Sequence, residues 1–524
     1  MPTRRAFVRS GVAALAAPLV LSRRADYDLV LRGGTIIDGT GGPAVEADLA
    51  VTGDRIAAIG PGLGRGVREI PVQGLVVAPG FVDIHSHGDG TLDEDPRAES
   101  LIRQGITTIV VGQDGGSRPP AEIFALVKRV RPAVNVATMV GLGTVRGDVI
   151  GSERRPPTAL ELERMVGMVE EALIAGACGA STGLEYTPGG FASLEELIAL
   201  ARPLAKPRLP YATHMRNEDD HLLAALDEAI AVGKGAGCPV QISHLKAMGP
   251  RNWHRMGEAL GRLERATEAG VDTGFDVYPY VAYQTGLTTL FPLWSREGGT
   301  DAFLARLAEP EVGPRIREET LAKVDLIGGW NNVLVSGVAA VDAADAEGAR
   351  VGDLAKRRSE DPYRLVVGLL QRNRGRVGMV GFAMSEENVD LALRHALATV
   401  CSDGVSAALE GPARVGHPHP RSLGTFPRVL GRYVRERRAL PLEDAVRKMS
   451  SRAAARCRLA RRGGLAAGYA ADVVVFDPGT VADRATFENP FQYPEGIRIV
   501  LVNGALTLRD GERIDRAGRA LSPA

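Results

Sequence analysis

Two histidines separated by a single residue are the most evident candidates for chemistry. They are His85 and His87, in the segment GFVDIHSHGDG that spans residues 80–90. If this apolar run is a strand, alternate side chains point to the same face and the two imidazoles project together. Two neutral imidazoles at a strand end suit a divalent ion such as zinc, with further ligands from other strands. The spacing favours a metal site; two surface histidines are the alternative.

Three further candidate ligands close later strand-like runs. They are His214 in YATHMRNE, His244 in QISHLKAMG and Asp403 in TVCSDG. Taken singly, each histidine fits a hydrogen-bonded structural role, and the aspartate fits a cap before glycine. The chain has nine histidines, and four of them fall at the ends of predicted strands. This distribution favours one shared site.

Asp114 has two interpretations. It follows the apolar run TIVVG and precedes two glycines, a pattern typical of a turn. It also closes a strand-like run, the position at which the candidate ligands of other strands occur. The residues alone leave a turn and a metal-binding carboxylate both open.

The elements that must position these residues alternate between strand and helix. Six apolar runs end in polar clusters and are followed by Ala/Leu/Glu-rich stretches, which predicts a parallel α/β sheet. So many units favour a closed barrel over residues 80–465, with its catalytic groups at the carboxyl ends of the strands. Residues 286–395 interrupt this alternation of strands and helices and are predicted to contain an insertion. The six runs are GITTIVVGQD, ACGASTGLEY, LPYATHMRNE, CPVQISHLK, GVDTGFDVYPY and ALATVCSDG.

The two ends of the chain have a different residue pattern from the segment between them. Residues 26–79 and 466–524 contain short β-branched runs separated by Gly, Asp and Asn turns. Together they predict a small β-domain built from both chain ends. The fold class is therefore α/β, a barrel that carries a second, smaller β-domain.

The first 25 residues resemble a twin-arginine export signal. Arg4 and Arg5 precede Phe7 and a short apolar stretch, residues 11–21, that is too short to span a bilayer. This predicts transfer by the twin-arginine export machinery to the periplasm, with no stable membrane association. A basic start of a cytosolic protein is the alternative.

Composition describes a soluble globular chain. It has 63 basic and 63 acidic residues among 524 and is 45% hydrophobic, so nothing global indicates nucleic acid as a partner. Its four cysteines are widely spaced and form no CxxC motif, and we predict buried small hydrophobes.

Several longer motifs resemble those of one known protein family. STGLEYTPG, SHLKAMG, DVYPY, CSDG and PHPRSLGTFPRVL, together with the HxH pair, resemble the D-aminoacylase (N-acyl-D-amino-acid deacylase) family of the amidohydrolase superfamily. The resemblance covers about residues 27–510. It implies a TIM-like (β/α)8 barrel with a small β-sandwich domain built from both chain ends, a zinc site, and hydrolysis of the amide of N-acyl-D-amino acids.

The resemblance also implies roles for individual ligands. His85 and His87 match a pair that, with Asp403, surrounds a weakly held metal, whereas His214 and His244 match ligands of a tightly held zinc. The family typically places a cysteine where this chain has Asp114. A carboxylate oxygen is harder than a thiolate, so manganese or another harder ion becomes an alternative to zinc.

The resemblance implies substrate-binding residues as well. Lys246, Tyr278 and Arg421 match residues that bind the substrate carboxylate, Tyr186 matches a site tyrosine, and Gln284 replaces a serine. Glu185 is a weaker candidate, and His417 and His419, in a Pro-rich loop, rank below the other histidines as ligands. Asp403 is implied to take a proton from water and return it to the leaving amine.

Two other functions stay open at this point. One is a cyclic-amide hydrolase of the dihydroorotase or hydantoinase type, which shares the HxH pair. We find no strand-end lysine suited to bridging two metals, which argues against it. The other is a non-catalytic periplasmic binding protein on the same fold, which predicts broken ligand sets.

Overall fold

The computed structural model describes residues 25–524. The predicted export signal, residues 1–25, therefore lies outside the described residues except for its final alanine. Among the described helices, none is both long enough and apolar enough to cross a membrane.

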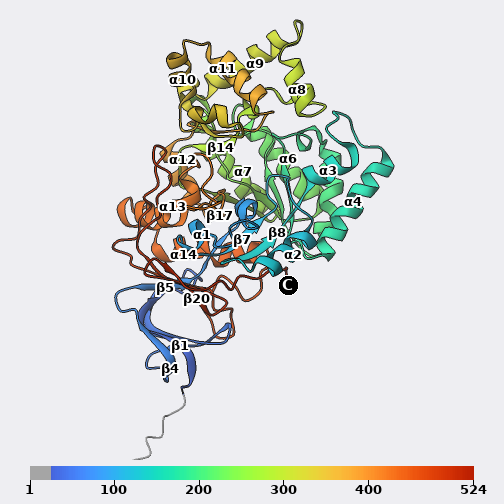
Figure 1. Cartoon of the computed structure of the whole chain (residues 1–524). Helices are drawn as coiled ribbons and strands as arrows, with labels where there is room; N and C mark the ends of the chain where they lie inside the picture. Colours follow the sequence, from blue (N-terminus) through green and yellow to red (C-terminus); the bar gives the residue numbers. More distant parts are fainter. Residues whose placement is uncertain (1–24) are drawn as a thin grey trace, which may run out of the picture.

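Short parallel strands form the centre of the molecule (Figure 1). They make two sheets, in the orders β6-β7-β8 and β9-β10-β11-β12-β13-β17, and Met139 alone separates β8 from β9. Past the ends of β17 and β6, the Asp403 amide donates to the His85 carbonyl at 2.9 Å, and the His87 amide donates to the Gly404 carbonyl at 2.9 Å. The two sheets thus adjoin at both edges. The strands are β6 (Phe81–Asp83), β7 (Ile106–Val111), β8 (Asn135–Thr138), β9 (Val140–Gly141), β10 (Ala180–Gly183), β11 (Tyr211–His214), β12 (Val240–Ile242), β13 (Thr273–Val277) and β17 (Ala398–Val400).

Six of these strands fall inside the six predicted runs: β7, β10, β11, β12, β13 and β17. Sequence reasoning missed β8, within PAVNVATMVG, because that run lacks a polar cluster at its end. The strands are buried throughout, as expected when both faces of a parallel sheet are covered.

Amphipathic helices cover the parallel strands. Helix α6 is representative: Leu222, Leu226, Ala229 and Val232 recur at helical spacing and are buried. Helix α4 begins with a capping box, in which the Thr158 side chain accepts from the Glu161 amide. The helices are α1 (Glu99–Ile102), α2 (Pro120–Val130), α3 (Leu142–Ile150), α4 (Ala159–Ile174), α5 (Leu194–Ala201), α6 (Leu222–Ala236), α7 (Met256–Glu268), α12 (Glu386–Arg394), α13 (Arg421–Arg428), α14 (Leu442–Met449) and α15 (Ser451–Arg456).

Strands from both ends of the chain form one nine-stranded sheet, in the order β21-β20-β19-β18-β5-β1-β2-β3, with β4 on β1. The two ends join where β18 pairs antiparallel with β5 and Val474 lies opposite Ala78. Its apolar core includes Leu31, Leu49 and Val473. The strands are β1 (Tyr27–Ile36), β2 (Val45–Thr52), β3 (Arg55–Gly60), β4 (Gly66–Pro71), β5 (Val76–Pro79), β18 (Val473–Phe476), β19 (Ile497–Val502), β20 (Ala505–Arg509) and β21 (Glu512–Arg513).

A separate unit interrupts the chain between β13 and β17. It has a three-stranded antiparallel sheet, β14-β16-β15, and four helices at the end of the molecule opposite β1 and β4 (Figure 1). Helix α12 contacts α7, β13 and β17, so we define the inserted segment as residues 283–381. Its elements are β14 (Tyr283–Gly286), α8 (Thr300–Arg306), α9 (Gly313–Leu326), β15 (Val333–Val338), α10 (Val351–Arg358), α11 (Pro362–Arg372) and β16 (Val377–Gly381).

Candidate metal centre

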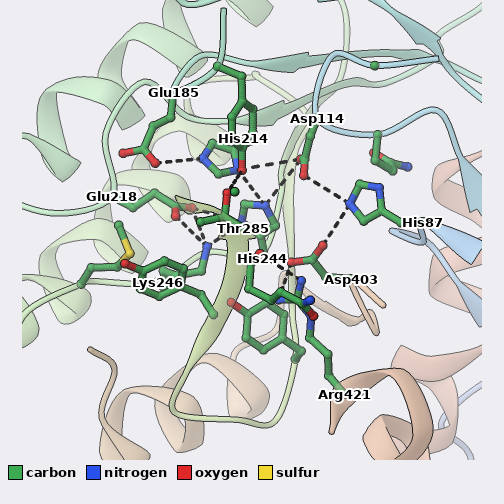
Figure 2. Close-up of a pocket in the computed structure, with 18 of the residues that line it drawn as sticks. His87, Asp114, Glu185, His214, Glu218, His244, Lys246, Thr285, Asp403 and Arg421 are labelled. Carbon is green, nitrogen blue, oxygen red and sulfur yellow. Dashed lines mark hydrogen bonds and ion pairs between the residues drawn. The ribbon is translucent and has the colours of Figure 1, made fainter. Parts of the chain in front are cut away.

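Five strand ends bring the predicted ligands together (Figure 2). His214 is the last residue of β11, and the other predicted ligands follow their strands by two to four residues. The carboxyl ends of parallel strands lie at one edge of the sheet, so side chains far apart in sequence meet there. The strands are β6 for His85 and His87, β7 for Asp114, β11 for His214, β12 for His244 and β17 for Asp403.

The six residues form two overlapping groups that share Asp114. In the first, His87 Nε2 lies 3.2 Å from Asp403 Oδ1 and 3.4 Å from Asp114 Oδ2. His85 Nε2 lies 3.4 Å from Asp114 Oδ1 and 3.5 Å from Asp403 Oδ1. This group contains the residues that the resemblance assigned to one metal position.

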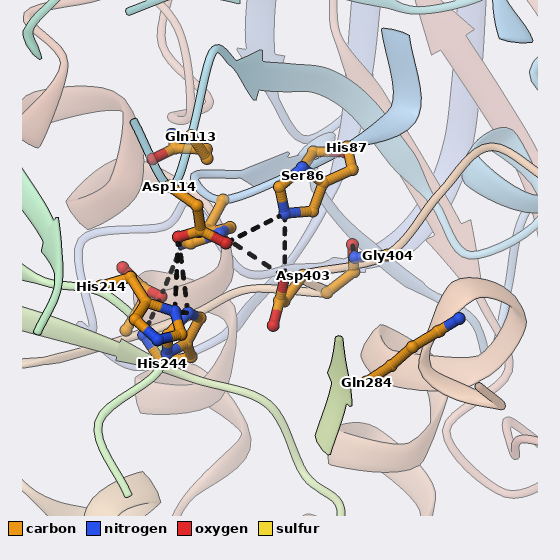
Figure 3. Close-up of polar contacts among 12 residues, drawn as sticks. Ser86, His87, Gln113, Asp114, His214, His244, Gln284, Asp403 and Gly404 are labelled. Atoms are coloured by element: carbon orange, nitrogen blue, oxygen red, sulfur yellow. Dashed lines mark hydrogen bonds and ion pairs between the residues drawn. The ribbon is translucent and has the colours of Figure 1, made fainter. Parts of the chain in front are cut away.

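The second group contains Asp114, His214 and His244 (Figure 3). His244 Nε2 lies 3.5 Å from Asp114 Oδ1, and His214 Nδ1 lies 3.1 Å from His244 Nε2. Asp114 presents Oδ2 to the His87 side and Oδ1 to His244. The carboxylate thus lies between the two groups.

Asp114 is a turn residue as well as a member of both groups. Its φ is +54°, and Gly112 and Gly115 on either side have φ of +74° and +77°. Aspartate tolerates this left-handed conformation better than most residues. The Ser181 hydroxyl, on β10, donates to the Gly112 carbonyl at 2.6 Å and accepts from the Gly115 amide at 3.1 Å. The two interpretations of Asp114 are therefore compatible, because the turn aims the carboxylate.

The donor set fits a divalent ion. Among the described residues, His85 Nε2 and Asp114 Oδ1 are buried and have no hydrogen-bond partner, an arrangement that is costly unless another group satisfies them. Imidazole nitrogens with carboxylate oxygens suit zinc and related ions. Burial raises the pKa of Asp114, but the surrounding histidines outweigh burial and hold it well below its usual range. The carboxylate is therefore ionised.

Carboxylates also support the far side of three of these histidines. Asp276 Oδ1 lies 3.6 Å from His85 Nδ1, Glu218 Oε1 lies 3.1 Å from His244 Nδ1, and Glu185 Oε2 lies 3.4 Å from His214 Nε2. Such partners fix the orientation of a ligand ring and increase its basicity. Sequence reasoning did not name Asp276 or Glu218 as site residues. Asp276 is the first residue of DVYPY, and Glu218 is the last residue of LPYATHMRNE.

A cavity of about 470 Å³ adjoins both groups and contains the predicted substrate-binding residues. Arg421 and Lys246 both lie near the ring of Tyr278, with Arg421 Cζ 4.8 Å and Lys246 Nζ 5.8 Å from the ring centroid. Arg421 Nη1 lies 2.8 Å from Asp403 Oδ2. Lys246 Nζ donates to both oxygens of Glu218, at 2.7 and 2.8 Å. Two cations thus face one cavity, each already beside a protein carboxylate.

Arg421 also controls the charge state of Asp403. Burial raises the pKa of Asp403, but Arg421 first, and then His244 and His85, outweigh burial and hold that pKa far below its usual range. Arg421 Nε is buried and has no hydrogen-bond partner among the described residues. The Arg421 side chain thus has an unused donor and also lines the cavity.

Tyr186 and Gln284 also line the cavity. The Tyr186 hydroxyl lies 3.1 Å from Thr285 Oγ1 and 3.5 Å from His214 Nδ1, next to the second group. Gln284 is held from both sides of its amide: Nε2 donates to Ser336 Oγ at 3.2 Å and Oε1 accepts from the His419 amide at 3.1 Å.

His417 and His419 lie outside both groups. His419 Nε2 lies 3.0 Å from the Ala282 carbonyl, and its Nδ1 accepts from the Arg421 amide at 3.0 Å. His417 Nε2 lies 2.6 Å from the Phe487 carbonyl. Both rings bind backbone, in agreement with their low rank as ligands. The four cysteines are buried and free, as predicted.

Known proteins provide independent evidence. An amidohydrolase family model matches residues 382–508. N-acyl-D-glutamate deacylase from Alcaligenes xylosoxydans xylosoxydans is 38% identical over 94% of this chain and 96% of its own. D-aminoacylase from the same organism is 38% identical over 91% of this chain and 94% of its own.

A solved structure agrees with these sequence relatives. N-acyl-D-glutamate deacylase from Bordetella bronchiseptica, complexed with zinc and a phosphonate that mimics the tetrahedral intermediate, superposes with a TM-score of 0.81. It is 36% identical and covers 95% of this chain and 99% of its own. The agreement thus extends over nearly the whole length in both sequence and fold. The protein belongs to the D-aminoacylase (N-acyl-D-amino-acid deacylase) family of the amidohydrolase superfamily.

Proposed function

We propose that the protein is a metal-dependent hydrolase that cleaves N-acyl-D-amino acids into a carboxylate and a free D-amino acid. One observation carries the proposal: the histidine–carboxylate groups and the Arg421–Tyr278–Lys246 set face the same cavity. The first could activate water, and the second could hold the carboxylate of an amino acid. The substrates named for the relatives support the same reaction.

Asp403 is the proposed general base and then general acid. A bound divalent ion would supply Lewis-acid activation of water and of the scissile carbonyl. Asp403 Oδ1 faces His85 and His87, whereas Oδ2 faces Arg421. In its ionised form, Asp403 can accept a proton from water and pass it to the departing nitrogen.

The cations orient the substrate. Arg421, Lys246 and Tyr278 receive its free carboxylate, and Gln284 borders the same region of the cavity. A planar guanidinium beside a fixed aromatic ring restricts the carboxylate to few orientations, which can select one hand at the α-carbon. Tyr186, beside His214, is placed to donate to the scissile carbonyl oxygen as negative charge develops.

The metal-binding residues are His85, His87, Asp114, His214, His244 and Asp403, and the proposed ion is zinc or a harder ion such as manganese. Asp114 Oδ1 lies between the two groups, 3.4 Å from His85 and 3.5 Å from His244, and Oδ2 lies 3.4 Å from His87. Replacing Asp114 with cysteine tests the preference: Asp114→Cys should shift bound metal from manganese toward zinc. Metal analysis of both proteins after equal loading would measure this, and unchanged metal identity and affinity would contradict it.

The fold that presents this site is proposed to be one closed TIM-like (β/α)8 barrel. The parallel pairing within each sheet and the hydrogen bonds that join Asp403 to His85 and His87 to Gly404 support closure. The β8–β9 interruption at Met139 would then be an irregularity within one strand.

The test of function is a panel of N-acetyl amino acids in both configurations, given to metal-loaded protein. Release of free amino acid should be faster by ~10²-fold or more for the D forms, because a fixed carboxylate site selects the hand of the α-carbon. Equal rates for D and L forms, or activity on hydantoins alone, would favour the cyclic-amide alternative. Binding without turnover would favour the non-catalytic alternative.

The place of action is proposed to be the periplasm, reached through the twin-arginine export machinery. The Arg4–Arg5 pair ahead of a short apolar stretch supports this. Arg4→Lys with Arg5→Lys should leave the protein in the cytoplasm, as measured by fractionation. Equal periplasmic yield from both forms would contradict the proposal.

A further inference from the structure

The loop after β10 carries two residues of the site, and the inserted segment holds both. Lys323 of α9 places Nζ 3.7 Å from Glu185 Oε1. Arg296, at the end of the 3-10 turn Leu293–Arg296, donates from Nη2 to the Glu185 carbonyl at 2.8 Å. Thr285 of β14 hydrogen-bonds the Tyr186 hydroxyl at 3.1 Å. Three separate stretches of the insertion therefore converge on two adjacent residues.

Glu185 in turn contacts His214 on the nitrogen that faces away from the other ligands. Its Oε2 lies 3.4 Å from His214 Nε2 (Figure 2), whereas His214 Nδ1 faces His244 and Asp114. A carboxylate at the outer nitrogen fixes the plane of the ring and increases the basicity of the inner nitrogen. The position of Glu185 therefore affects how His214 presents its lone pair.

Lys323 is well suited to fix that position. Its side chain is 20% exposed, and its Nζ contacts Asp219 Oδ2 at 2.5 Å as well as Glu185. Burial lowers the pKa of Lys323, but Glu185 and Asp219 outweigh burial and raise it, so the ammonium stays charged. Anchored by Asp219, it holds Glu185 Oε1 and leaves Oε2 for His214.

A comparison with His244 shows how the support of His214 differs. His244 Nδ1 contacts Glu218, and Lys246 donates to Glu218 at 2.7 Å, so this carboxylate also has a lysine partner. Both Lys246 and Glu218 follow strands of the parallel sheet. Lys323 comes from the insertion instead, so the support of His214 depends on a different unit of the fold.

We propose that Lys323 is a positioning residue through which the inserted segment holds Glu185 against His214 and so controls retention of the ion. The proposal rests on the metal centre proposed above. It gives the insertion a part in metal retention, beyond lining the cavity with Tyr283, Gln284 and Thr285.

The direct test measures zinc affinity with a competing chromophoric chelator. Glu185→Gln and Lys323→Met should each weaken binding at the His214–His244 position by ~10- to 100-fold and leave the His85–His87 position nearly unchanged. Lys323→Arg should keep most of the zinc affinity that Lys323→Met loses, because arginine keeps a cation beside Glu185 and Asp219. Loss of the Lys323 charge also removes repulsion of the ion, so tighter or unchanged binding in Lys323→Met would overturn the proposal.

Arg315→Met is the matched control. Arg315 lies on the same helix, is 66% exposed and pairs with Glu319, so its loss should leave zinc affinity unchanged. Thermal unfolding of the metal-free proteins would show whether Lys323→Met folds; if it does not, Glu185→Gln decides the result. Zinc affinity is independent of turnover, so a protein that shows these shifts but does not hydrolyse N-acyl-D-amino acids would refute the proposed function alone.

Discussion

Asp403 is the residue at which the proposed metal binding and the proposed proton transfer coincide. Its two oxygens face different groups, Oδ1 toward His87 at 3.2 Å and Oδ2 toward Arg421 at 2.8 Å. One carboxylate therefore contacts both the metal-ligand set and the cation proposed to hold the substrate. Loss of its charge should affect turnover more than metal content, because the other five ligands remain.

The Asp403→Asn variant tests this separation. It should retain bound metal and lose ~10²- to 10⁴-fold in kcat, because an amide cannot accept the proton from water. Metal analysis and turnover on the same preparation would measure both. A rate near that of the unmodified protein would show that Asp403 is not the base.

Metal uptake should depend on pH through His87. Partial burial lowers the pKa of His87, but the carboxylates of Asp114 and Asp403, 3.4 and 3.2 Å from its Nε2, outweigh this effect and raise that pKa to about 9. Below that value a proton must leave before His87 can bind an ion. Affinity at the His85–His87 position should therefore rise by ~10-fold or more per pH unit between about pH 6 and pH 8, because the pKa of His85 is raised as well; chelator competition would measure this. A pH-independent affinity would contradict this.

At the scale of elements, the turn after β7 aims Asp114, and Gly115 makes the turn possible. Gly115 has φ of +77°, and an added Cβ would lie 2.8 Å from the Gly183 amide nitrogen. Gly115→Ala should lower the free energy of unfolding by ~1–2 kcal/mol or more and weaken metal binding.

Gly116 offers a neighbouring control for that change. A Cβ there would have its nearest neighbour at 3.9 Å, and the residue is not in the left-handed region. Gly116→Ala should therefore leave the unfolding midpoint and metal affinity close to those of the unmodified protein. Equal effects of both substitutions on calorimetry and metal content would show that the turn does not constrain Asp114.

The sequence predicted the strand ends of the site well and the contacts between units poorly. His85, His214, His244 and Asp403 follow apolar runs, so local pattern alone placed them at one edge. Lys323 gave no such signal, because helical periodicity does not reveal which residue of an inserted helix reaches Glu185. Contacts between residues far apart in sequence depend on the packing of whole units, and local pattern does not encode that packing.

At the scale of the molecule, the proposed metal centre, with its two overlapping ligand groups, joins five strands of the parallel sheets. Ligands come from β6, β7, β11, β12 and β17. Removing the ion with a chelator should lower the thermal midpoint, because an ion bound only by the folded state stabilises it by about 2.7 kcal/mol at 100 times its Kd.

The same experiment has a built-in control. Returning metal should restore the midpoint in the unmodified protein, and it should restore less in Glu185→Gln at equal metal concentration. Calorimetry across a metal titration would measure both. A midpoint that does not respond to metal would show that the ion does not bind the folded state preferentially.

The pairing of β18 with β5 also determines when this protein can finish folding. The ribosome delivers β5 early and β18 almost at the end of synthesis, so β5 lacks this neighbour while most of the chain is being made. Gly80 alone separates β5 from β6, the strand that leads to His85 and His87. The first two proposed metal ligands are therefore synthesised early, whereas the strand that pairs with the neighbouring β5 is synthesised near the end. A chain released before residue 473 would keep an open sheet edge beside its metal ligands, the kind of edge at which aggregation begins.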